Sequence, residues 1–327
     1  MKDYKIVIDV MGSDNGPEIL IDGALNALKE HDDLSVILVG DENIISTKLS
    51  TCSYDKSKIE VIHASQVITN YDNPMQALFT KADSSLVVAL KTLSSQDDAI
   101  GLINAGSTGA LLAGSLRFVP AKELKRPALA AILPSEKGGF TCLVDTGANI
   151  DCSPSVLVNF AHMGSEFMQE HYGIKSPRIG LLSNGSECTK GNKLVKETHL
   201  LLKEEEGLNF VGNIEGNNAF SGDCDVLVTD GFAGNQLFKA TEGIARRIIT
   251  DAIKYAKATQ NGEIMKLVSH LLSIYDFSAL GGGIVLGAGK PIIKARGSAN
   301  ADSIKNTSSI LINMAKNRAL FYGKDFR

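Results

Sequence analysis

The residues best suited to chemistry lie where a predicted strand gives way to a predicted helix. An apolar run over 99–103 is followed by Asn104, Gly106, Ser107 and Thr108, and an apolar helical pattern begins directly after them. Free backbone N–H groups at a helix start, with the positive end of the helix dipole, favour an anion. The segment therefore predicts an anion-binding loop. From the local pattern alone, a capped core helix that binds no ligand is the alternative.

Four further strands are expected to end in polar, glycine-containing segments, near residues 9, 145, 184 and 230. In a parallel sheet the carboxyl ends of the strands form one edge, and ligands bind beyond it. These loops supply amides, hydroxyls, backbone N–H groups and one lysine, Lys190, which suit anion binding and oxyanion stabilisation. Phosphate is itself a nucleophile, so an enzyme that positions phosphate against a carbonyl needs no nucleophilic side chain.

Several side chains have both a chemical and a structural interpretation. Lys190, expected at a helix start, either supplies positive charge or is a solvated lysine of the first turn. His63, at the end of the third strand, is either a proton carrier or a hydrogen-bonded structural residue. Aspartates at strand ends cap backbone N–H groups by default. None of their pairs has the spacing of metal ligands, so we expect no metal.

Composition narrows the class of protein. A chain of 327 residues with 44% hydrophobic residues has room for two domains, or for one large α/β domain with a lobe. The net charge of −4 argues against nucleic acid as a partner. Five scattered cysteines without metal-ligand spacing indicate a reducing compartment. Neither a signal peptide nor a bilayer-spanning run is evident, so we expect a cytoplasmic protein.

Apolar strand-like runs alternate with helical patterns, which predicts an α/β fold with a mostly parallel sheet covered on both faces. We expect strands over 4–9, 34–40, 59–64, 99–104, 129–134, 140–145, 178–184, 208–212, 225–230, 283–286 and 291–295. We expect helices over 17–31, 84–94, 108–119, 154–172, 190–206, 235–258 and 298–318. No linker marks a firm boundary, so the prediction is one α/β domain over 1–327.

Seven motifs occur in one order along the chain: DVMGSDNGP at 9–17, NAGSTGA at 104–110, RPA at 126–128, DTGAN at 145–149, KGN at 190–192, GNIEG at 212–216 and VTDGFAGN at 228–235. In these motifs, and over nearly its full length, the sequence resembles the phosphate acyltransferases of phospholipid synthesis, the PlsX family. Family members usually carry His-Gly-Ser near the last strand, whereas this chain has Arg296, Gly297 and Ser298. Arginine cannot act as a base at neutral pH.

The resemblance implies that acyl-(acyl carrier protein) and inorganic phosphate react to give acyl phosphate and free carrier protein, without a cofactor. It implies a homodimer at the inner face of the cell membrane, in peripheral contact with lipid and with a downstream membrane acyltransferase. The implied fold is a Rossmann-like three-layer α/β/α sandwich, shared with phosphate acetyltransferases and isocitrate-type dehydrogenases.

The resemblance also implies residue roles by position in the matching motifs. Lys190 and Asn235 are the expected catalytic residues, followed by His63. The residues expected to bind phosphate or substrate are Asn104, Gly106, Ser107, Thr108, Asp145, Asn149, Asn192, Gly234, Arg296 and Ser298.

Three other functions fit parts of the pattern. A phosphate acetyl- or butyryltransferase that uses coenzyme A belongs to the same reaction class. A dehydrogenase would share the fold, but the G-x-G-x-x-G segment with a following acidic residue is missing. The non-enzymatic alternative is a membrane-recruited scaffold that binds acyl carrier protein.

A second apolar stripe follows a break at 261–262. Apolar residues recur there at i, i+3, i+4, i+7 and i+8, namely Ile264, Leu267, Val268, Leu271 and Leu272. This spacing predicts a helix with one apolar face. The face either packs on the core or a dimer interface, or belongs to a projecting hairpin over 244–280 that rests on lipid, as the family resemblance favours.

Overall fold

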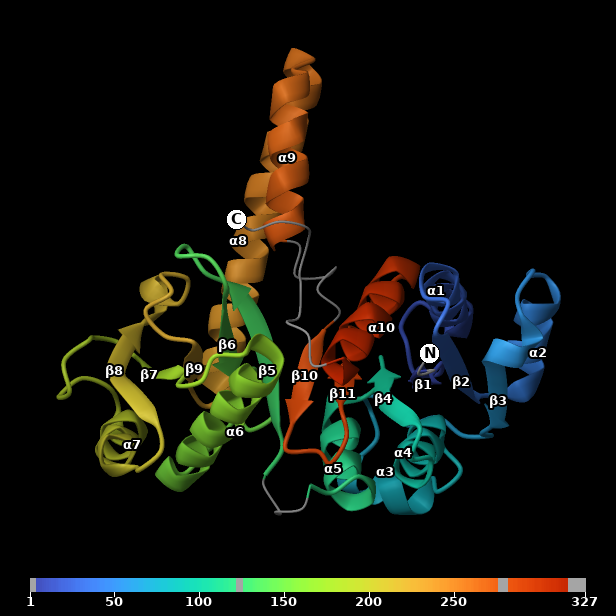
Figure 1. Cartoon of the computed structure of the whole chain (residues 1–327), viewed down its shortest axis with the longest axis horizontal. Helices are drawn as coiled ribbons and strands as arrows, with labels where there is room; N and C mark the ends of the chain where they lie inside the picture. Colours follow the sequence, from blue (N-terminus) through green and yellow to red (C-terminus); the bar gives the residue numbers. More distant parts are fainter. Residues whose placement is uncertain (1–3, 122–125, 276–281, 317–327) are drawn as a thin grey trace. The chain divides into compact units, whose positions relative to one another are not determined.

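The computed structural model describes residues 4–121, 126–275 and 282–316, which divide into two compact units. The first unit contains 4–121, 126–127 and 282–316, and the second contains 128–275. Figure 1 shows the elements of both units with their labels. The expectation of one domain over 1–327 stays a prediction.

The sheet of the first unit carries the loop that the sequence singled out. Its strand order is β3-β2-β1-β4-β11-β10, in which only β10 runs antiparallel to its neighbour β11. The strands are β1 (Tyr4–Asp9), β2 (Leu34–Gly40), β3 (Ile59–His63), β4 (Ala99–Asn104), β10 (Gly283–Leu286) and β11 (Ile292–Lys294). Their side chains form a core of buried aliphatic residues.

Helices cover both faces of this sheet. Helices α1 and α10 pack together, with α1 against β2 and α10 against β1 and β4. Helix α4 contacts β1, β2 and β4 (Figure 1). Gly23 allows the close packing of α1 on α10, because a Cβ there would lie 2.5 Å from the Ile304 Cβ. The helices are α1 (Pro17–Glu30), α2 (Glu42–Ser50), α3 (Pro74–Thr80), α4 (Ser85–Ser95), α5 (Thr108–Phe118), α10 (Ala301–Ala315) and the 3₁₀ turn Lys56–Lys58.

The second unit has a smaller sheet in the order β5-β6-β9-β7-β8, parallel except for the β5–β6 pair. Its strands are β5 (Ala128–Pro134), β6 (Phe140–Val144), β7 (Arg178–Ser183), β8 (Asn209–Glu215) and β9 (Val226–Val228). Its helices are α6 (Pro154–Tyr172), α7 (Lys193–Glu204), α8 (Gly231–Thr259), α9 (Gly262–Tyr275) and the 3₁₀ turn Gly216–Asn218. Helices α6 and α7 pack against each other.

The predicted α/β class with a mostly parallel sheet is confirmed, and several element ends differ for local reasons. Helix α7 begins at Lys193 rather than 190, because Asn192 caps it. Helix α8 begins at Gly231 rather than 235, because Asp230 caps it. The sequence analysis missed the short helices α2 and α3. The predicted helix over 298–318 begins at Ala301, and its last two residues lie outside the described part.

Helices α8 and α9 form a hairpin that extends away from the sheet of the second unit (Figure 1). Gln260 ends α8 in a left-handed conformation with φ of 51°, which reverses the chain. Val268 is only 1% exposed. Its side chain is covered in the folded chain, whereas Leu267 and Leu272 of the same predicted set are exposed. The lipid-facing set stays a prediction. Residues 276–280 of the predicted hairpin lie outside the described residues.

The described ranges contain no helix with both the length and the apolar character needed to cross a bilayer.

Candidate functional site

Three polar residues end adjacent parallel strands in the first unit. Asn104 of β4 lies in register with Asp9 of β1 on one side and with Lys294 of β11 on the other. The Asn104 side chain donates through Nδ2 to Asp9 Oδ2 (2.7 Å) and accepts the Gly106 N–H through Oδ1 (3.1 Å). Asn104 therefore shapes the predicted anion loop from beneath.

The loop after β1 lies directly against the loop after β4. Gly12 has φ of 77°, and a Cβ there would lie 3.2 Å from the Gly106 Cα. Any larger residue at position 12 would be strained by this φ and crowded by Gly106. The two backbones can approach closely for this reason.

Asp9 is a carboxylate in an apolar, buried position. Burial raises its pKa from 3.8 to about 6, although hydrogen bonds from Ser85, from the Met11 N–H and from Asn104 favour the charged form. Its ionisation is thus linked to the hydrogen bond that orients Asn104.

The start of α5 provides the donors of the anion loop. Ser107 occupies the N-cap position and is 6% exposed, yet its side chain makes no capping hydrogen bond to the described residues of α5. Thr108 is half-buried at the first helical position. The hydroxyl of Ser107 and the first N–H groups of α5 are donors of the kind that the predicted anion loop requires.

Lys294 was missed by the sequence analysis. It is 8% exposed, and its Nζ donates to the carbonyl oxygens of Ala105 (3.4 Å) and Ala295. The Lys294 ammonium group therefore lies against the backbone of the predicted anion loop. The available signal was a lysine at the end of an otherwise apolar strand, where desolvation of an ammonium group requires a specific partner.

The segment after β11 joins the same loops. The Gly297 carbonyl accepts the Asp14 N–H (2.8 Å) and the Ser13 hydroxyl (3.1 Å). Arg296 is half-buried and Ser298 is exposed. The loop after β1 thus contacts both the predicted anion loop and the segment that contains the predicted residues Arg296 and Ser298.

His63 lies apart from this cluster, on the edge strand β3. Its side chain is exposed, and Nδ1 accepts the N–H of Glu42, the first residue of α2, at 3.2 Å. This contact fits the structural interpretation of His63.

In the second unit, the Asp145 carboxylate organises the loop after β6. It accepts five hydrogen bonds, from the N–H groups of Leu129 (3.1 Å), Gly147 (3.2 Å), Ala148 (3.1 Å) and Asn149 (2.6 Å) and from Asn149 Nδ2 (2.9 Å). Both Asp145 and Asn149, predicted to bind substrate, are engaged in holding their own loop.

The first turns of α8 pack on this loop. Asp230 caps the helix by accepting the Ala233 N–H at 2.8 Å. A Cβ on Gly234 would lie 1.9 Å from the Asp145 carbonyl oxygen, so only glycine fits there. Asn235 lies in the second turn, and its Nδ2 donates to the Thr146 carbonyl at 3.0 Å. The expectation that Asn235 opens the helix was wrong, since Asp230 does so.

The KGN motif lies in the turn before α7. Lys190 is exposed, and its stem covers Gly185, where a Cβ would lie 2.6 Å from Lys190 Cγ. The Asn192 Oδ1 caps α7 by accepting the Val195 N–H at 2.9 Å.

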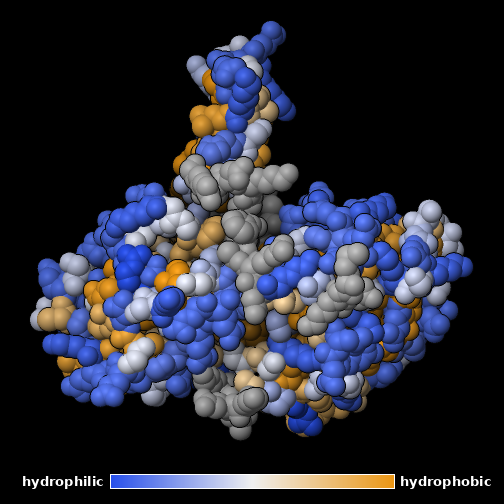
Figure 2. Space-filling view, in the orientation of Figure 1, coloured by the Kyte–Doolittle hydropathy of each residue, from blue (hydrophilic) through white to orange (hydrophobic). Residues whose placement is uncertain are grey.

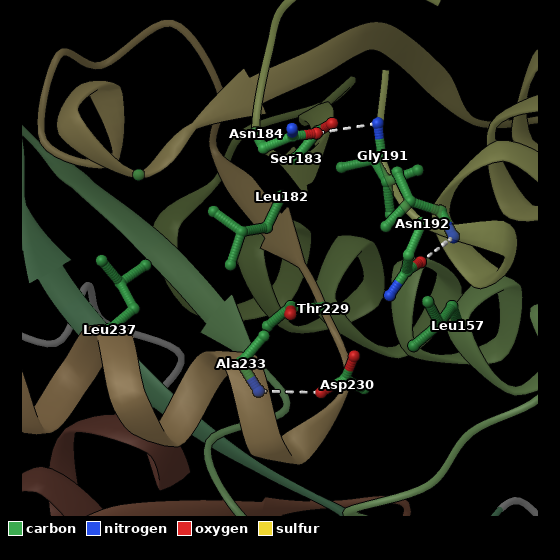
Figure 3. Close-up of a pocket in the computed structure, with 13 residues that line it drawn as sticks. Leu157, Leu182, Ser183, Asn184, Gly191, Asn192, Thr229, Asp230, Ala233 and Leu237 are labelled. Atoms are coloured by element: carbon green, nitrogen blue, oxygen red, sulfur yellow. Dashed lines mark hydrogen bonds between the residues drawn. The ribbon is translucent and has the colours of Figure 1, made fainter. Parts of the chain in front are cut away.

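A pocket of ≈ 560 Å³ lies at the carboxyl ends of β7 and β9. It is lined by the end of β7, by Gly191 and Asn192 of the KGN motif, and by Ala233 and Leu237 of α8 (Figure 3). Its volume falls in the range of small-molecule sites, about 300–1,000 Å³. Two motifs distant in sequence therefore line one pocket. Lys190 and Asn235 lie close to its lining residues in the sequence.

Comparison with solved structures defines the class of fold. The chain is similar to a phosphotransacetylase from Streptococcus pyogenes, with a TM-score of 0.64 and 16% identity over 97% of this chain and 94% of that chain. A branched-chain phosphotransacylase from Enterococcus faecalis V583 has a TM-score of 0.59 and 17% identity over 95% and 99% of the two chains. The predicted phosphate acetyltransferase fold is thereby confirmed.

Sequence relatives define the family. Residues 4–320 match the model of a family described as fatty acid synthesis protein. A phosphate acyltransferase from Clostridium beijerinckii is 40% identical over 93% of this chain and 92% of the relative. One from Clostridioides difficile is 38% identical over 97% and 94%. The chain belongs to this family, as the resemblance predicted, and the membership supports acyl transfer involving phosphate.

Proposed function

We propose that this protein is an acyl-(acyl carrier protein):phosphate acyltransferase that makes acyl phosphate for phospholipid synthesis. The observation that carries the proposal is the anion loop in a member of this family. Ser107 leaves its hydroxyl uncommitted to the described residues of α5, and the buried Lys294 adds positive charge below. A phosphate dianion is the substrate that this loop fits best.

In the proposed reaction, an oxygen of HPO₄²⁻ attacks the thioester carbonyl carbon. A carbon–oxygen bond forms, the carbon–sulfur bond breaks, and the thiolate of the carrier protein leaves. The thiolate takes up the proton that the phosphate loses, so the products are acyl phosphate dianion and free thiol. The protein's contribution is positioning and stabilisation of the negative charge that develops on the carbonyl oxygen.

Residue roles follow from the contacts of each side chain. Ser107 and Thr108 bind phosphate, and Arg296 adds positive charge to the same unit. Lys190 is exposed and has its ammonium group available to a substrate anion. Asn235 acts through the loop it holds at Thr146. His63 is left out of the catalytic set because Nδ1 already accepts the Glu42 N–H.

A coenzyme A-dependent reaction is the second candidate, since the structural neighbours include phosphotransacetylases. Purified protein should be supplied with phosphate and either dodecanoyl-acyl carrier protein or dodecanoyl-coenzyme A. We expect phosphate-dependent thiol release and acyl phosphate, seen by ³¹P NMR, with a higher kcat/KM for the carrier protein. A preference for coenzyme A would favour the second candidate. Carrier-protein binding without acyl phosphate from either donor would favour the scaffold.

Lys190 is tested by Lys190→Met, which keeps the stem over Gly185 and removes the charge. We expect kcat/KM to fall by roughly 100-fold, a typical loss for one stabilising donor, while the melting temperature changes little. Lys193→Met, at another exposed lysine, the first residue of α7, is the control. Equal, small effects of the two substitutions would identify Lys190 as a solvated surface residue.

The proposed partners are acyl carrier protein, a second copy of the chain, membrane lipid and a downstream membrane acyltransferase. Apolar side chains exposed on the α8–α9 hairpin support the contact with lipid or with a second hairpin. They include Ile244 and Ile248 on α8 and Leu267 and Leu272 on α9. In Figure 2 the tip of the hairpin is hydrophilic and the apolar residues lie along its sides, which favours a hairpin that lies against its partner.

A further inference from the structure

The pocket of the second unit has an aliphatic interior. Leu157 of α6, Leu181 and Leu182 of β7, Val195 of α7 and Leu237 of α8 all line it. Figure 3 shows Leu182 and Leu237 on one side of the opening and Leu157 on the other. Such a surface complements a saturated hydrocarbon chain, which has neither donors nor acceptors and gains from leaving water.

The rim of the pocket consists of polar groups whose acceptors are committed to the backbone. Asn184 Oδ1 accepts the Gly191 N–H at 2.8 Å, and Asn192 Oδ1 accepts the Val195 N–H at 2.9 Å. Because the Oδ1 atoms of Asn184 and Asn192 already accept these hydrogen bonds, the Nδ2 groups of the two side chains remain as donors for a ligand. In Figure 3 the Asn192 nitrogen points into the pocket.

Ser183 adds a third donor to this rim. Its Oγ is buried and has no hydrogen-bond partner within the described part of the chain. The Gly191 backbone passes close by, since a Cβ on Gly191 would lie 3.4 Å from Ser183 Oγ. A buried hydroxyl without a partner is costly, so a ligand that supplies an acceptor is favoured at this position.

We propose that this pocket binds the acyl group of the substrate, with the hydrocarbon chain against the leucines and the carbonyl oxygen at the donors of Ser183, Asn184 and Asn192. The inference rests on the proposed function and extends it to the residues that select chain length. A carbonyl oxygen is a pure acceptor and matches a rim of donors.

The opposite wall orients the acyl group. Asp230 lies across the pocket from Asn184 and Asn192 in Figure 3, and its carboxylate caps α8. A phosphate placed beside this carboxylate would be repelled. The anionic end of acyl phosphate therefore points out of the pocket, and the chain points in.

Chain-length selection provides the first test. Ala233→Leu adds volume at the pocket wall, and Leu237→Ala removes it. With acyl-carrier-protein substrates of 6 to about 16 carbons, each methylene that no longer fits should lower kcat/KM by roughly fourfold. We expect Ala233→Leu to shift the preference to shorter chains and Leu237→Ala to longer ones.

Ala240→Leu, the same exchange at an exposed position of the same helix, should leave the chain-length profile unchanged. Wild-type profiles in both pocket variants would overturn the proposal.

The donors are tested by Ser183→Ala. Because this change removes a buried hydroxyl without a partner, we expect an unchanged or higher melting temperature. The kcat/KM should nevertheless fall by roughly 10- to 100-fold for every chain length. Full activity of this variant would remove Ser183 from the site.

Direct binding separates this inference from the proposed reaction. If the wild-type protein makes no acyl phosphate, the proposed function fails, and calorimetry with methyl dodecanoate, an uncharged ester, then decides the pocket alone. Binding to wild type that is weakened in Ala233→Leu but not in Ala240→Leu would support the acyl pocket. No binding to the wild type would overturn it.

Discussion

Two buried ionisable side chains, Asp9 and Lys294, position the loop after β4. They belong to β1 and β11, the two strands on either side of β4. Asp9 of β1 orients the Asn104 amide, and Lys294 of β11 donates to the Ala105 carbonyl. The loop backbone is thus positioned without using the hydroxyls of Ser107 and Thr108. At the scale of residues, the groups that shape the anion site are distinct from the groups proposed to touch the anion.

The raised pKa of Asp9 predicts a specific pH dependence of stability. The folded protein binds more protons than the unfolded chain between pH 3.8 and about 6, so the contribution of Asp9 to stability falls as the pH rises through this window. Asp9→Asn cannot ionise. In urea titrations, we expect wild type to lose stability relative to Asp9→Asn from pH 4 to 6.5, by at most roughly 3 kcal/mol. A difference that does not vary with pH would contradict this assignment.

Two serines at helix N-caps provide a matched comparison. Ser84 caps α4 by accepting the Val87 N–H at 3.5 Å, whereas Ser107 makes no such bond to the described residues of α5. We expect Ser84→Ala to cost about 0.5–2 kcal/mol of stability with normal kinetics. Ser107→Ala should leave stability nearly unchanged and raise the KM for phosphate. Melting curves and phosphate titrations measure both effects, and a normal phosphate KM in Ser107→Ala would remove Ser107 from the anion site.

At the scale of elements, α8 serves two purposes along its length. Its first turns are locked to the loop after β6 by the Asp230 cap, by the contact of Gly234 with the Asp145 carbonyl and by the Asn235 amide. Its later turns leave the sheet and form the hairpin with α9. Substitutions in the first turns should therefore affect the core of the second unit, while those in the later turns should not.

Two glycines of α8 test this division. A Cβ on Gly234 would lie 1.9 Å from a backbone oxygen, while a Cβ on Gly243 has no neighbour within 4 Å. We expect Gly234→Ala to cost at least roughly 2 kcal/mol of stability, as overpacking against backbone does. Gly243→Ala should stabilise by up to about 1 kcal/mol through helix propensity. Chemical denaturation measures both, and equal effects would show that the helix start is not locked.

At the scale of the whole molecule, many of the exposed apolar side chains among the described residues lie on the α8–α9 hairpin. Ile244, Ile248 and Tyr255 of α8 and Leu267 of α9 are more than half exposed. Val268 is instead buried. A surface that is apolar along its sides is suited to interfacial contact with lipid or with another copy.

The lipid proposal predicts that Leu267→Glu with Leu272→Glu abolishes sedimentation with anionic liposomes. Burying carboxylates in lipid is costly, while both positions are exposed in the folded chain, so the variant should remain folded and active on soluble acyl-carrier substrate. Lys257→Gln with Lys266→Gln changes the net charge by the same amount without touching the apolar side chains, and it should weaken binding only partly. Wild-type sedimentation of the leucine variant would place lipid contact elsewhere, and loss of the dimer alone would make these leucines interface residues.

The sequence by itself determined the class of fold, most strand positions and the family, and it predicted the anion loop. Strands β1, β2 and β4 were predicted to the residue, because apolar runs that end in small polar residues depend only on local burial patterns. The predicted starts of α7 and α8 were wrong by a few residues, because Asn192 and Asp230 cap these helices. Asparagine and aspartate serve both as helix caps and as substrate-binding groups, so the sequence alone does not distinguish the two roles.

Only the tertiary structure decided which polar side chains are already engaged in hydrogen bonds within the protein. Asp145 and Asn149 hold their own loop, Asn104 binds Asp9 from 95 positions away, and Val268 is covered. The pocket proposed to bind the acyl group likewise requires β7, the KGN motif and α8 to meet. Sequence patterns report the periodicity of burial along one element, but the partner of a polar group and the walls of a cavity depend on packing between distant segments.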